Sequence, residues 1–564
     1  MHHPPRSRTQ NRRSILWGFG ALSAAVVVSQ GPSSAMAVNA KVASPSQQYG
    51  GVAHATPHVK VVVRSSQRET EGLVRAVRAV GGRVTRNLST LSSVAAEIPP
   101  GSLPALRATP GVASVTRDRI ALPTQTSMAV SAVGAASDVH TLTGVSYEIK
   151  ADAAWAQGFE GNGVDVAVVD TGVSPVPGLA RRIVANVDFS SDAQNPALRN
   201  LDAYGHGTHI AGIIAAKADG GQTKGVAPKA RIVNVKIGAA NGMTSTSAMV
   251  SGIDWIIKNG RKNGLNVRVI NISYAAPPSL WLDDPVAMAV GAANEAGFIV
   301  VASAGNDATG RLGSPAYQPD IISVAAIDQG ALPGLTDNTV APFSSAGLLV
   351  RPTLGAPGTS IASLVVPGSL SALAMPAARV GTGYIKATGT SQSAAVVSGA
   401  AALLAQKWPK ATPLQIKQIL ASSAVKVGGD GKAQGAGMIQ LDRALATPLP
   451  EVSTTPTFYA TTVQVGKDLQ GLATSDALAT YASRATNDKR FITPYASSPT
   501  DADASAITAA TPWSGMTWSG MTWSGTTWSG MTWSGMTWSG MTWSGMTWSG
   551  MTWSGMSWSS SIWG

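Results

Sequence analysis

The sequence predicts an α/β protein in which helices cover both faces of a parallel β-sheet. Between residues 145 and 449, short β-branched runs alternate with helical patterns, and the runs are apolar throughout. Such runs are typical of strands that are buried on both faces of a parallel sheet. A compact unit with both strand and helix patterns precedes this domain, and a low-complexity tail of Trp-Ser-Gly-Met-Thr repeats follows it. We therefore expect parts of three different kinds.

Composition agrees with a folded chain and limits its chemistry. The 564 residues are 44% hydrophobic and 13% charged, which is enough apolar material for a large core. The sequence has no cysteine, so disulfides, thiolate metal sites and cysteine nucleophiles are excluded. The formal net charge is +12, but residues 123–564 hold 27 basic and 26 acidic residues and are nearly neutral. Because the excess lies in segments that we expect to be removed, it does not indicate binding to nucleic acid.

The first 37 residues have the pattern of a secretory signal. Four arginines precede an apolar stretch at 15–28, and the small-residue site Ala35-Met36-Ala37 follows. The apolar stretch is too short and too rich in Ala and Gly to span a membrane. Arg12-Arg13 also fits a twin-arginine signal, so the export route stays open between the two systems. We expect a secreted protein that is extracellular or associated with the cell surface.

Residues 58–122 predict a small α+β unit. Strands are expected at 59–63 and 94–98, an amphipathic helix at 69–80 and a short helix at 103–108. Polar linkers are expected on either side of the unit, at 38–57 and 123–144.

The larger domain, 145–449, predicts buried strands that alternate with helices. The strands are expected at 164–169, 232–235, 267–272, 298–302 and 321–326. The helices are expected at 207–216, 246–259, 285–296, 393–407 and 413–422. In a parallel sheet, sites form beyond the carboxyl ends of the strands, so polar residues just after these strands are the candidates for a functional site.

The first of these strands leads into Asp170, within Val168-Val169-Asp170-Thr171-Gly172. A carboxylate there lies at the edge of the sheet where active sites form. An apolar pair before Asp-Thr-Gly is also found in the lobes of aspartic peptidases, but the sequence holds no second such motif, so only a homodimer could complete that carboxylate pair. The structural alternative is an Asp that caps a turn.

Two histidines lie at the start of a predicted helix, in Gly205-His206-Gly207-Thr208-His209. They are the only histidines after residue 140, so an imidazole base in the larger domain is one of these two. The pair could bind metal instead, but it lacks the spacing and the intervening Glu of a zinc peptidase, and no cysteine can assist. We therefore predict no metal ligands and interpret His209 as a hydrogen-bonded structural histidine.

Ser391 and Asn306 add two further candidate groups. Ser391 opens a long apolar helix, whose dipole and N-terminal N–H groups face the space around its hydroxyl. Asn306 follows the strand at 298–302 and could donate an N–H to a developing oxyanion. Each has a structural alternative, a helix N-cap for Ser391 and a turn residue for Asn306. Ordinary turns alone are a poor explanation for the joint occurrence of the segments that hold Asp170, His206, Asn306 and Ser391.

With these motifs, residues 145–449 resemble the subtilisin-like serine peptidases, or subtilases. The resemblance rests on segments 168–172, 205–212, 225–228, 303–306, 343–345, 355–358 and 389–391. The order Asp, His, Ser along the chain is that of subtilisin. The resemblance implies a triad of Asp170, His206 and Ser391, with Asn306 in the oxyanion hole. It also implies that residues 58–122 are an inhibitory prodomain.

The resemblance further places the substrate-binding residues. An extended substrate is expected to pair with Ser273, Tyr274 and Ala275. The wall and floor of a side-chain pocket are assigned to Ala302, Ser303, Ala304, Gly305 and Gly313. These residues are small, which favours a sizeable apolar substrate side chain, whereas Arg311 could draw an acidic one. The chain departs from the family pattern at Gln392, Ser393 and Ala395 after the serine, and at Tyr274-Ala275 on the binding edge.

The tail at 512–564 has a period that matches no regular secondary structure. Trp recurs at every fifth position from Trp513 to Trp563, whereas a helix repeats at 3.6 residues and a strand at 2. One hypothesis is retention on cell-wall or another surface polymer by aromatic stacking, and the other is an extension that is trimmed during maturation. Residues 450–511, rich in Thr, Ala and Ser, form a separate extension.

The sequence thus predicts a secreted serine endopeptidase that hydrolyses polypeptides through an acyl-enzyme and is made as a zymogen, with its own prodomain as intramolecular inhibitor. The alternative is a catalytically inactive surface-binding protein that uses the Trp-rich tail, and the full set of Asp, His, Ser and Asn argues against it. No cofactor is expected for catalysis. Structural calcium is common in the family, but the sequence assigns no ligands to it.

Overall fold

In a computed structural model of the chain, the described residues are 58–451 except 68, 125–138, 218–223, 277–283, 309–311, 333 and 348–349. Several predicted segments lie outside the described residues: the signal at 1–37, the linker at 38–57, nearly all of the extension at 450–511 and the tail at 512–564. Of the predicted linker at 123–144, residues 123, 124 and 139–144 are described.

The small N-terminal domain is an antiparallel sheet with two helices. The strands lie in the order β2-β3-β1-β4. Their bounds are β1 (Val59–Ser65), β2 (Arg83–Leu88), β3 (Ser93–Ile98) and β4 (Val112–Arg117), and the helices are α1 (Glu71–Ala79) and α2 (Leu103–Arg107). Val61 and Val63 of β1 pack against both helices, whereas Val62 between them belongs to the core of the larger domain. The sheet is therefore buried on both faces.

The larger domain is built on a mostly parallel sheet, which confirms the predicted fold class. The strand order is β14-β13-β12-β10-β6-β8-β7, with β15 paired to β13 beside this path. Only β14 runs antiparallel to its neighbour, β13, among these strands. The bounds are β6 (Asp165–Asp170), β7 (Ile183–Asp188), β8 (Arg231–Lys236), β10 (Val267–Ile272), β12 (Ile299–Ser303), β13 (Ile322–Asp328), β14 (Thr339–Val340) and β15 (Leu354–Pro357).

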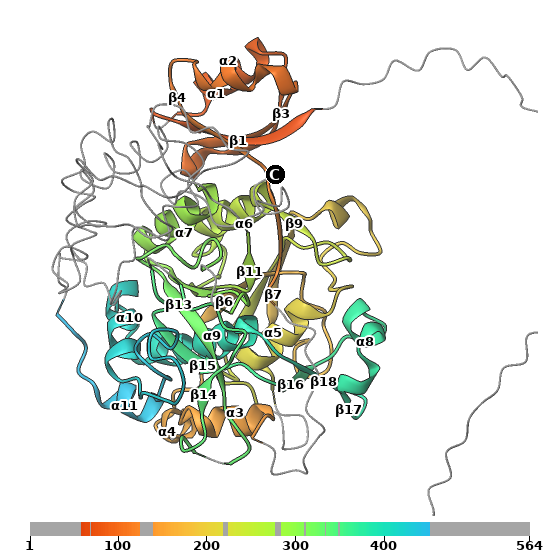
Figure 1. Ribbon diagram of the computed structural model, residues 1–564. Helices are drawn as coiled ribbons and strands as arrows, with labels where there is room; N and C mark the ends of the chain where they lie inside the picture. Colours follow the sequence, from red (N-terminus) through yellow and green to blue (C-terminus); the bar gives the residue numbers. More distant parts are fainter. Residues whose placement is uncertain are drawn as a thin grey trace, which may run out of the picture. The chain divides into compact units, whose positions relative to one another are not determined.

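Helices cover both faces of this sheet (Figure 1). On β6, Val166 and Val168 face one core and Ala167 and Val169 face the other, so alternate side chains are buried on opposite sides. The first core is shared with α3 (Leu142–Glu148), α4 (Ala151–Ala156), α5 (His206–Ala215), α9 (Thr390–Lys407), α10 (Pro413–Ser422) and α11 (Leu441–Ala446). The second core is shared with α6 (Thr246–Asn259) and α7 (Pro285–Glu295).

A small antiparallel sheet packs beside α5. It consists of β16 (Ile361–Leu364), β17 (Arg379–Val380) and β18 (Tyr384–Ala387), and α8 (Leu370–Ala374) lies between β16 and β17 in the chain.

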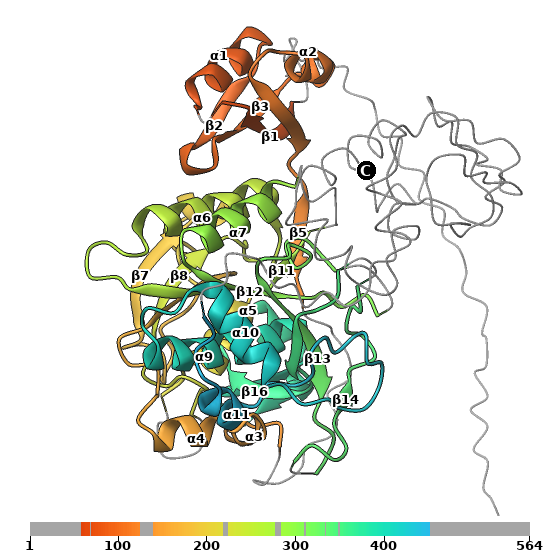
Figure 2. The ribbon, with the colours of Figure 1, turned by 90° about the vertical axis from the view of Figure 1, so that its left-hand side faces the viewer.

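Strand β5 (Ile120–Pro123) connects the small domain to the edge of the larger one. It is antiparallel to both of its neighbours, β9 (Thr244–Ser245) and β11 (Tyr274–Ala275) (Figure 2). Just before β5, Asp118 accepts hydrogen bonds from the backbone N–H of Ser247 at 2.7 Å and from its hydroxyl at 2.6 Å. Ser247 lies in the first turn of α6, where free N–H groups and the helix dipole favour a carboxylate.

The predicted strands and helices occur within a few residues of their expected bounds, but the remaining elements were not predicted, among them β2, β4, β5, β7 and β15. Residues of β2 and β7 alternate in exposure, so these strands lack the unbroken apolar run that identifies the central ones. The linker was expected to begin at 123, yet Pro123 ends β5 and Thr124 is only 6% exposed. The extended structure reaches beyond the expected boundary because its partners, β9 and β11, are distant in sequence.

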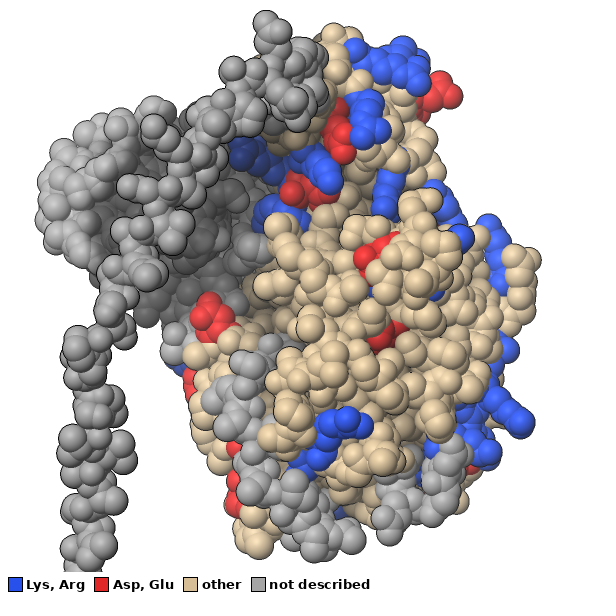
Figure 3. All heavy atoms as spheres, turned by 90° about the vertical axis from the view of Figure 1, so that its right-hand side faces the viewer, with Lys and Arg blue, Asp and Glu red and all other residues tan. Residues whose placement is uncertain are grey.

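Charged side chains are unevenly spread on the face that Figure 3 shows, where much of the described surface of the larger domain is formed by uncharged residues. This agrees with the 13% of charged residues in the chain. In the described part of the chain, no helix combines the length and the apolar character that crossing a membrane requires.

Candidate active site

Four of the predicted site residues lie at the carboxyl end of the parallel sheet. Asp170 is the last residue of β6, and His206 is the first residue of α5. Ser391 is the second residue of α9, and Asn306 follows β12 by three residues. Asp170, His206 and Ser391 are at most 1% exposed. The fold therefore gathers these distant segments at one edge of the sheet, as expected for a site in an α/β protein.

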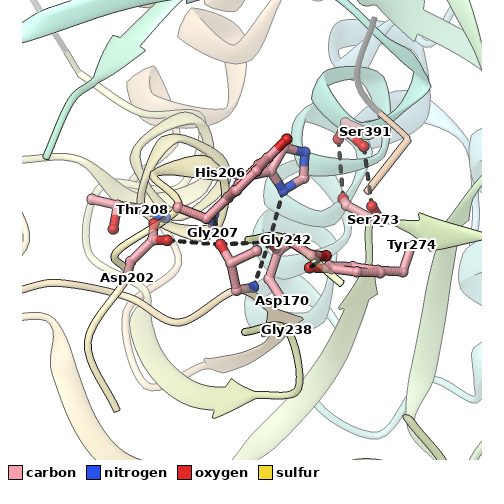
Figure 4. Close-up of polar contacts among 12 residues, drawn as sticks. Asp170, Asp202, His206, Gly207, Thr208, Gly238, Gly242, Ser273, Tyr274 and Ser391 are labelled. Atoms are coloured by element: carbon pink, nitrogen blue, oxygen red, sulfur yellow. Dashed lines mark hydrogen bonds and ion pairs between the residues drawn. The ribbon is translucent and has the colours of Figure 1, made fainter. Parts of the chain in front are cut away.

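Asp170 and His206 are joined by a hydrogen bond of 2.7 Å between Oδ1 and Nδ1 (Figure 4). The backbone N–H of Thr171 donates to the same Oδ1 at 2.7 Å. A neutral imidazole that donates from Nδ1 carries its lone pair on Nε2. Nε2 of His206 is buried and makes no hydrogen bond to any described residue, so the ring retains an unused proton acceptor.

Asp202 supports this pair and is a residue that sequence reasoning missed. Its carboxylate accepts hydrogen bonds from the backbone N–H groups of Gly205 and Thr208, both at 2.7 Å, and from the hydroxyl of Thr171 at 2.8 Å. Burial raises the pKa of Asp202, and these donors oppose that rise. Asp202 thus links the turn after β6 to the first turn of α5. It lies in an irregular segment between β7 and α5, and no motif marks it.

The hydroxyl of Ser391 contacts the residue that follows β5. Its Oγ lies 2.6 Å from Oγ1 of Thr124 and donates to the carbonyl of Ser273 at 3.2 Å. The backbone N–H of Ser391 donates to the carbonyl of Thr124 at 3.3 Å, and the N–H of Thr124 donates to the carbonyl of Ser273 at 3.0 Å. The carbonyl at the end of β5 is thereby held at the N-terminus of α9.

Asn306 is oriented by Thr390. Its Oδ1 accepts a hydrogen bond from the backbone N–H of Thr390 at 3.0 Å and from its hydroxyl at 2.9 Å. A backbone N–H can only donate, so the amide oxygen must face Thr390 and Nδ2 must face the other way. Nδ2 makes no hydrogen bond to a described residue and would lie 3.1 Å from a Cβ placed on Gly389. The carbonyl oxygen of Thr124 crowds the same point, so both groups border Gly389.

The predicted substrate-binding residues lie around β5 and Thr124. In β11, Tyr274 pairs with Pro123 and Ala275 pairs with Leu122. Ser273 precedes β11 and is fully buried. The structure thus places the three predicted pairing residues next to an extended segment.

The predicted pocket residues lie on two neighbouring segments. Ala302 and Ser303 end β12, and Oγ of Ser303 accepts a hydrogen bond of 2.5 Å from Oγ1 of Thr124. The N–H of Gly305 donates to the hydroxyl of Thr390 at 3.1 Å, which ties this segment to the start of α9. The N–H of Gly313 donates to the carbonyl of Ala304 at 3.1 Å. Arg311, the alternative determinant of specificity, lies outside the described residues.

Tyr274 is fully buried and reaches from β11 to the histidine. Its ring packs edge-on to that of His206, with 6.4 Å between the ring centroids and 85° between the planes. Its hydroxyl donates to the carbonyl of Gly242 at 2.8 Å. Burial raises the pKa of Tyr274 well above its usual value, and the charge of Asp170 adds to this rise, so the phenol stays neutral.

Gln392, a departure from the family pattern, is fully buried beside the nucleophile candidate. Neither atom of its side-chain amide has a hydrogen-bond partner among the described residues. A Cβ on Gly389 would lie 3.0 Å from its Oε1. The polar side chain therefore lies against the turn that leads into α9.

His209 makes the hydrogen bonds of a structural histidine. Its Nε2 lies 3.1 Å from the carbonyls of Ile361 in β16 and Ile385 in β18, and it can donate to either. Burial, with a smaller contribution from His206, lowers the pKa of His209 to about 4. Within the described ranges, no three His, Asp or Glu side chains come together as ligands for a metal ion.

Comparison with known proteins gives matches over both described domains. Residues 161–438 match the family described as "Subtilase family", and residues 41–118 match the one described as "Putative peptidase inhibitor domain". Serine protease AprX from Bacillus subtilis (strain 168) is 32% identical over 302 residues, which are 51% of this chain and 67% of that protein. Subtilisin Savinase from Lederbergia lenta is 34% identical over 297 residues, which are 52% of this chain and 96% of that protein.

A solved structure gives a similar result. Fervidolysin from Fervidobacterium pennivorans, a keratinolytic enzyme related to subtilisin, superposes with a TM-score of 0.57 and 28% sequence identity. The match covers 70% of this chain and 62% of that chain.

The lowered pKa of His209 predicts a specific loss of stability in acid. The unfolded chain binds a proton near pH 6.5 and the folded chain only near pH 4, so stability falls as the pH drops from 6.5 towards 4. Between pH 7.5 and pH 5, this one group lowers the free energy of unfolding by about 2 kcal/mol. We expect His209→Gln to reduce the difference between urea unfolding at these two pH values by about that amount.

The comparison is best made in a Ser391→Ala background, which prevents self-digestion. A uniform loss of stability in His209→Gln does not affect the test, because only the difference between the two pH values counts. An unchanged difference would show that His209 does not have a depressed pKa in the folded chain.

Proposed function

The chain belongs to the subtilase family, and from this premise we propose that it is a secreted serine endopeptidase, made as a zymogen, in which Asp170, His206 and Ser391 form the catalytic triad. The observation that carries the proposal is the seating of β5. This strand lies between β9 and β11 as an extended substrate would, and the carbonyl of Thr124 accepts a hydrogen bond from the N–H of Ser391.

His206 has the carboxylate contact that orients a general base. Asp170 holds the ring through Nδ1 and stabilises the imidazolium that forms when Nε2 takes a proton. The hydroxyl of Ser391 donates to the carbonyl of Ser273 in this structure, so the proposed mechanism requires it to turn to Nε2 by rotation about the Cα–Cβ bond. Oγ then attacks the substrate carbonyl while its proton passes to Nε2.

The remaining steps use the same groups in reverse. The backbone N–H of Ser391 and Nδ2 of Asn306 donate to the oxyanion of the tetrahedral intermediate. Collapse of the intermediate breaks the C–N bond, and His206 gives its proton to the leaving amine. Water then attacks the acyl-enzyme, with His206 again as the base, and releases the carboxylic acid and Ser391. These steps call for no cofactor.

The N-terminal domain has the contacts of an inhibitor that stays bound. β5 fills the gap between β9 and β11, and Asp118 and Arg119 anchor it from the preceding turn. Arg119 forms an ion pair of 2.8 Å with the buried carboxylate of Asp284. A substrate that enters the site must displace this segment.

Export and retention at the cell surface are part of the proposal on sequence grounds alone. The signal pattern at 1–37 supports secretion, and the aromatic repeats at 512–564 support binding to a surface polymer. Both segments lie outside the described residues.

A serine-directed fluorophosphonate should label the mature protein and should not label Ser391→Ala, because only an activated serine hydroxyl reacts. Ser393→Ala is a matched control, since it removes a buried hydroxyl two residues further along α9 that has no hydrogen-bond partner among the described residues. Labelling that persists in Ser391→Ala, or that is absent from the native protein, would favour an inactive binding protein.

Asn306→Ala should lower kcat by about 100- to 1,000-fold and leave KM nearly unchanged. The size of this effect is the one found on removal of the oxyanion-hole asparagine of a subtilisin. The physical reason is that Nδ2 donates to a charge that develops only in the transition state. Steady-state kinetics with a peptide p-nitroanilide measure both constants, and an unchanged kcat would remove Asn306 from the mechanism.

Maturation should cleave the bond between Thr124 and Gln125. The N–H of Ser391 marks the position of the attacked carbonyl, and it contacts that of Thr124. Mass spectrometry of the released N-terminal fragment should give a chain that ends at Thr124, whereas Ser391→Ala should remain a single uncleaved chain. A fragment that ends at any other residue would contradict the assignment, even if the mature N-terminus is trimmed later.

A further inference from the structure

We propose that this enzyme cleaves after small hydroxylated residues, above all threonine, and that Ala275 and Ser303 set this preference. The inference rests on the proposed function, because it concerns the side chain next to the bond that Ser391 attacks. Following convention, we call that substrate residue P1 and the residue three positions before it P4.

Thr124 occupies the P1 position and its side chain is enclosed. It is 6% exposed, and its hydroxyl lies 2.5 Å from Oγ of Ser303 and 3.2 Å from the carbonyl of Ser273. Ser303 and Ser273 are both fully buried. A buried hydroxyl needs a hydrogen-bond partner, so a P1 residue without one leaves Ser303 unsatisfied on this side.

The floor of the pocket is closed by direct contact between its walls. A Cβ placed on Gly313 would lie 2.5 Å from Cβ of Ala275, so the methyl group of Ala275 already fills the space in front of Gly313. The next residues, Ala276 and Ser314, exchange two backbone hydrogen bonds of 3.0 Å. The N–H of Gly313 also donates to the carbonyl of Ala304 at 3.1 Å. This bond joins the segment that follows β12 to the segments of Gly313 and Ala275.

These contacts limit the size of the P1 side chain. An aromatic ring would have to displace the methyl group of Ala275 or separate two hydrogen-bonded backbone segments. The sequence predicted a sizeable apolar P1 side chain only because the residues of the pocket wall are small. The structure adds that small residues let the walls approach until little space remains between them.

The buried residue of β5 itself is small as well. Ala121, at P4, is 1% exposed and packs in the core of the larger domain, whereas Ile120 and Leu122 are 56% and 54% exposed. Ala121 thus faces the protein between two outward-facing neighbours. Both side chains that this protein buries from its own segment are therefore small.

The test uses the mature enzyme and four substrates of the form Ala-Leu-Pro-Xaa-p-nitroanilide, with Xaa as Thr, Val, Phe or Glu. Valine has the shape of threonine without the hydroxyl, so the ratio of kcat/KM for the Thr peptide to that for the Val peptide measures the hydrogen bond. We expect kcat/KM to be about tenfold higher for the Thr peptide. Phenylalanine measures the size limit, and we expect kcat/KM for Thr to exceed that for Phe by at least about tenfold. Glutamate tests the acidic alternative, which would give it the highest kcat/KM.

Two variants assign these effects to residues. Ala275→Gly should raise kcat/KM for Phe relative to Thr by about tenfold or more, because it removes the methyl group from the floor. Ser303→Ala should lower the ratio of Thr to Val, because the shorter of the two hydrogen bonds of the hydroxyl is lost and only the carbonyl of Ser273 remains as a partner. Ala276→Gly is the matched control: it removes a methyl group one position along, which is buried in the second core, and it should leave all ratios unchanged.

The native enzyme alone decides the main point, even if a variant fails to fold. A higher kcat/KM for Phe or Glu than for Thr would overturn the proposal and leave the serine peptidase intact. Hydrolysis of none of the four peptides with normal fluorophosphonate labelling would also overturn it. Failure of labelling, by contrast, would contradict the proposed function itself.

Discussion

The site depends on the close approach of helix α5 to the end of strand β6. A Cβ on Gly207 would overlap the carbonyl oxygen of Gly172 and lie 3.1 Å from Cβ of Asp170. Only glycine lets the helix begin this near to the strand, and this proximity brings Nδ1 of His206 within 2.7 Å of the carboxylate. Gly172 itself has a φ of 115°, so the turn between them is also one that glycine favours. The two glycines thus determine whether the hydrogen bond between Asp170 and His206 can form.

Buried charges hold that turn in place. Lys236, fully buried beside Asp170 on the neighbouring strand β8, donates to the carbonyls of Thr171 and Gly238 at 2.8 Å. Asp202 binds the same turn through the hydroxyl of Thr171. A buried charge without hydrogen-bond partners is costly in free energy. Movement of the turn would break the hydrogen bonds of Lys236 and Asp202 and is therefore disfavoured. The carboxylate of Asp170 is therefore presented by a backbone with little freedom to move.

The sequence predicts those parts of the site that are encoded locally. Asp170 follows an unbroken apolar run and His206 is flanked by glycines, so element and residue can be inferred together. Asp202 could not be found in this way, because its partners come from two elements that meet only in the folded chain. The close approach of Ala275 to Gly313 could not be predicted for the same reason, since residue size predicts the volume of a pocket only when the spacing of its walls is known. Likewise β5 ends in a proline before a polar stretch, and its pairing with β9 and β11 cannot be read from that segment.

Within the proposed mechanism, β5 shows how one geometry can serve both a substrate and an inhibitor. Main-chain pairing with β9 and β11 and the carbonyl on the N–H of Ser391 are available to any extended peptide. The contacts of Asp118 with Ser247 and of Arg119 with Asp284 are not, because they come from the folded domain that precedes the strand. After cleavage a substrate fragment keeps only the main-chain contacts and dissociates. The N-terminal domain keeps these contacts and also those of Asp118 and Arg119. In this proposal, removal of the N-terminal domain is therefore the step that leaves Ser391 free to act on other chains.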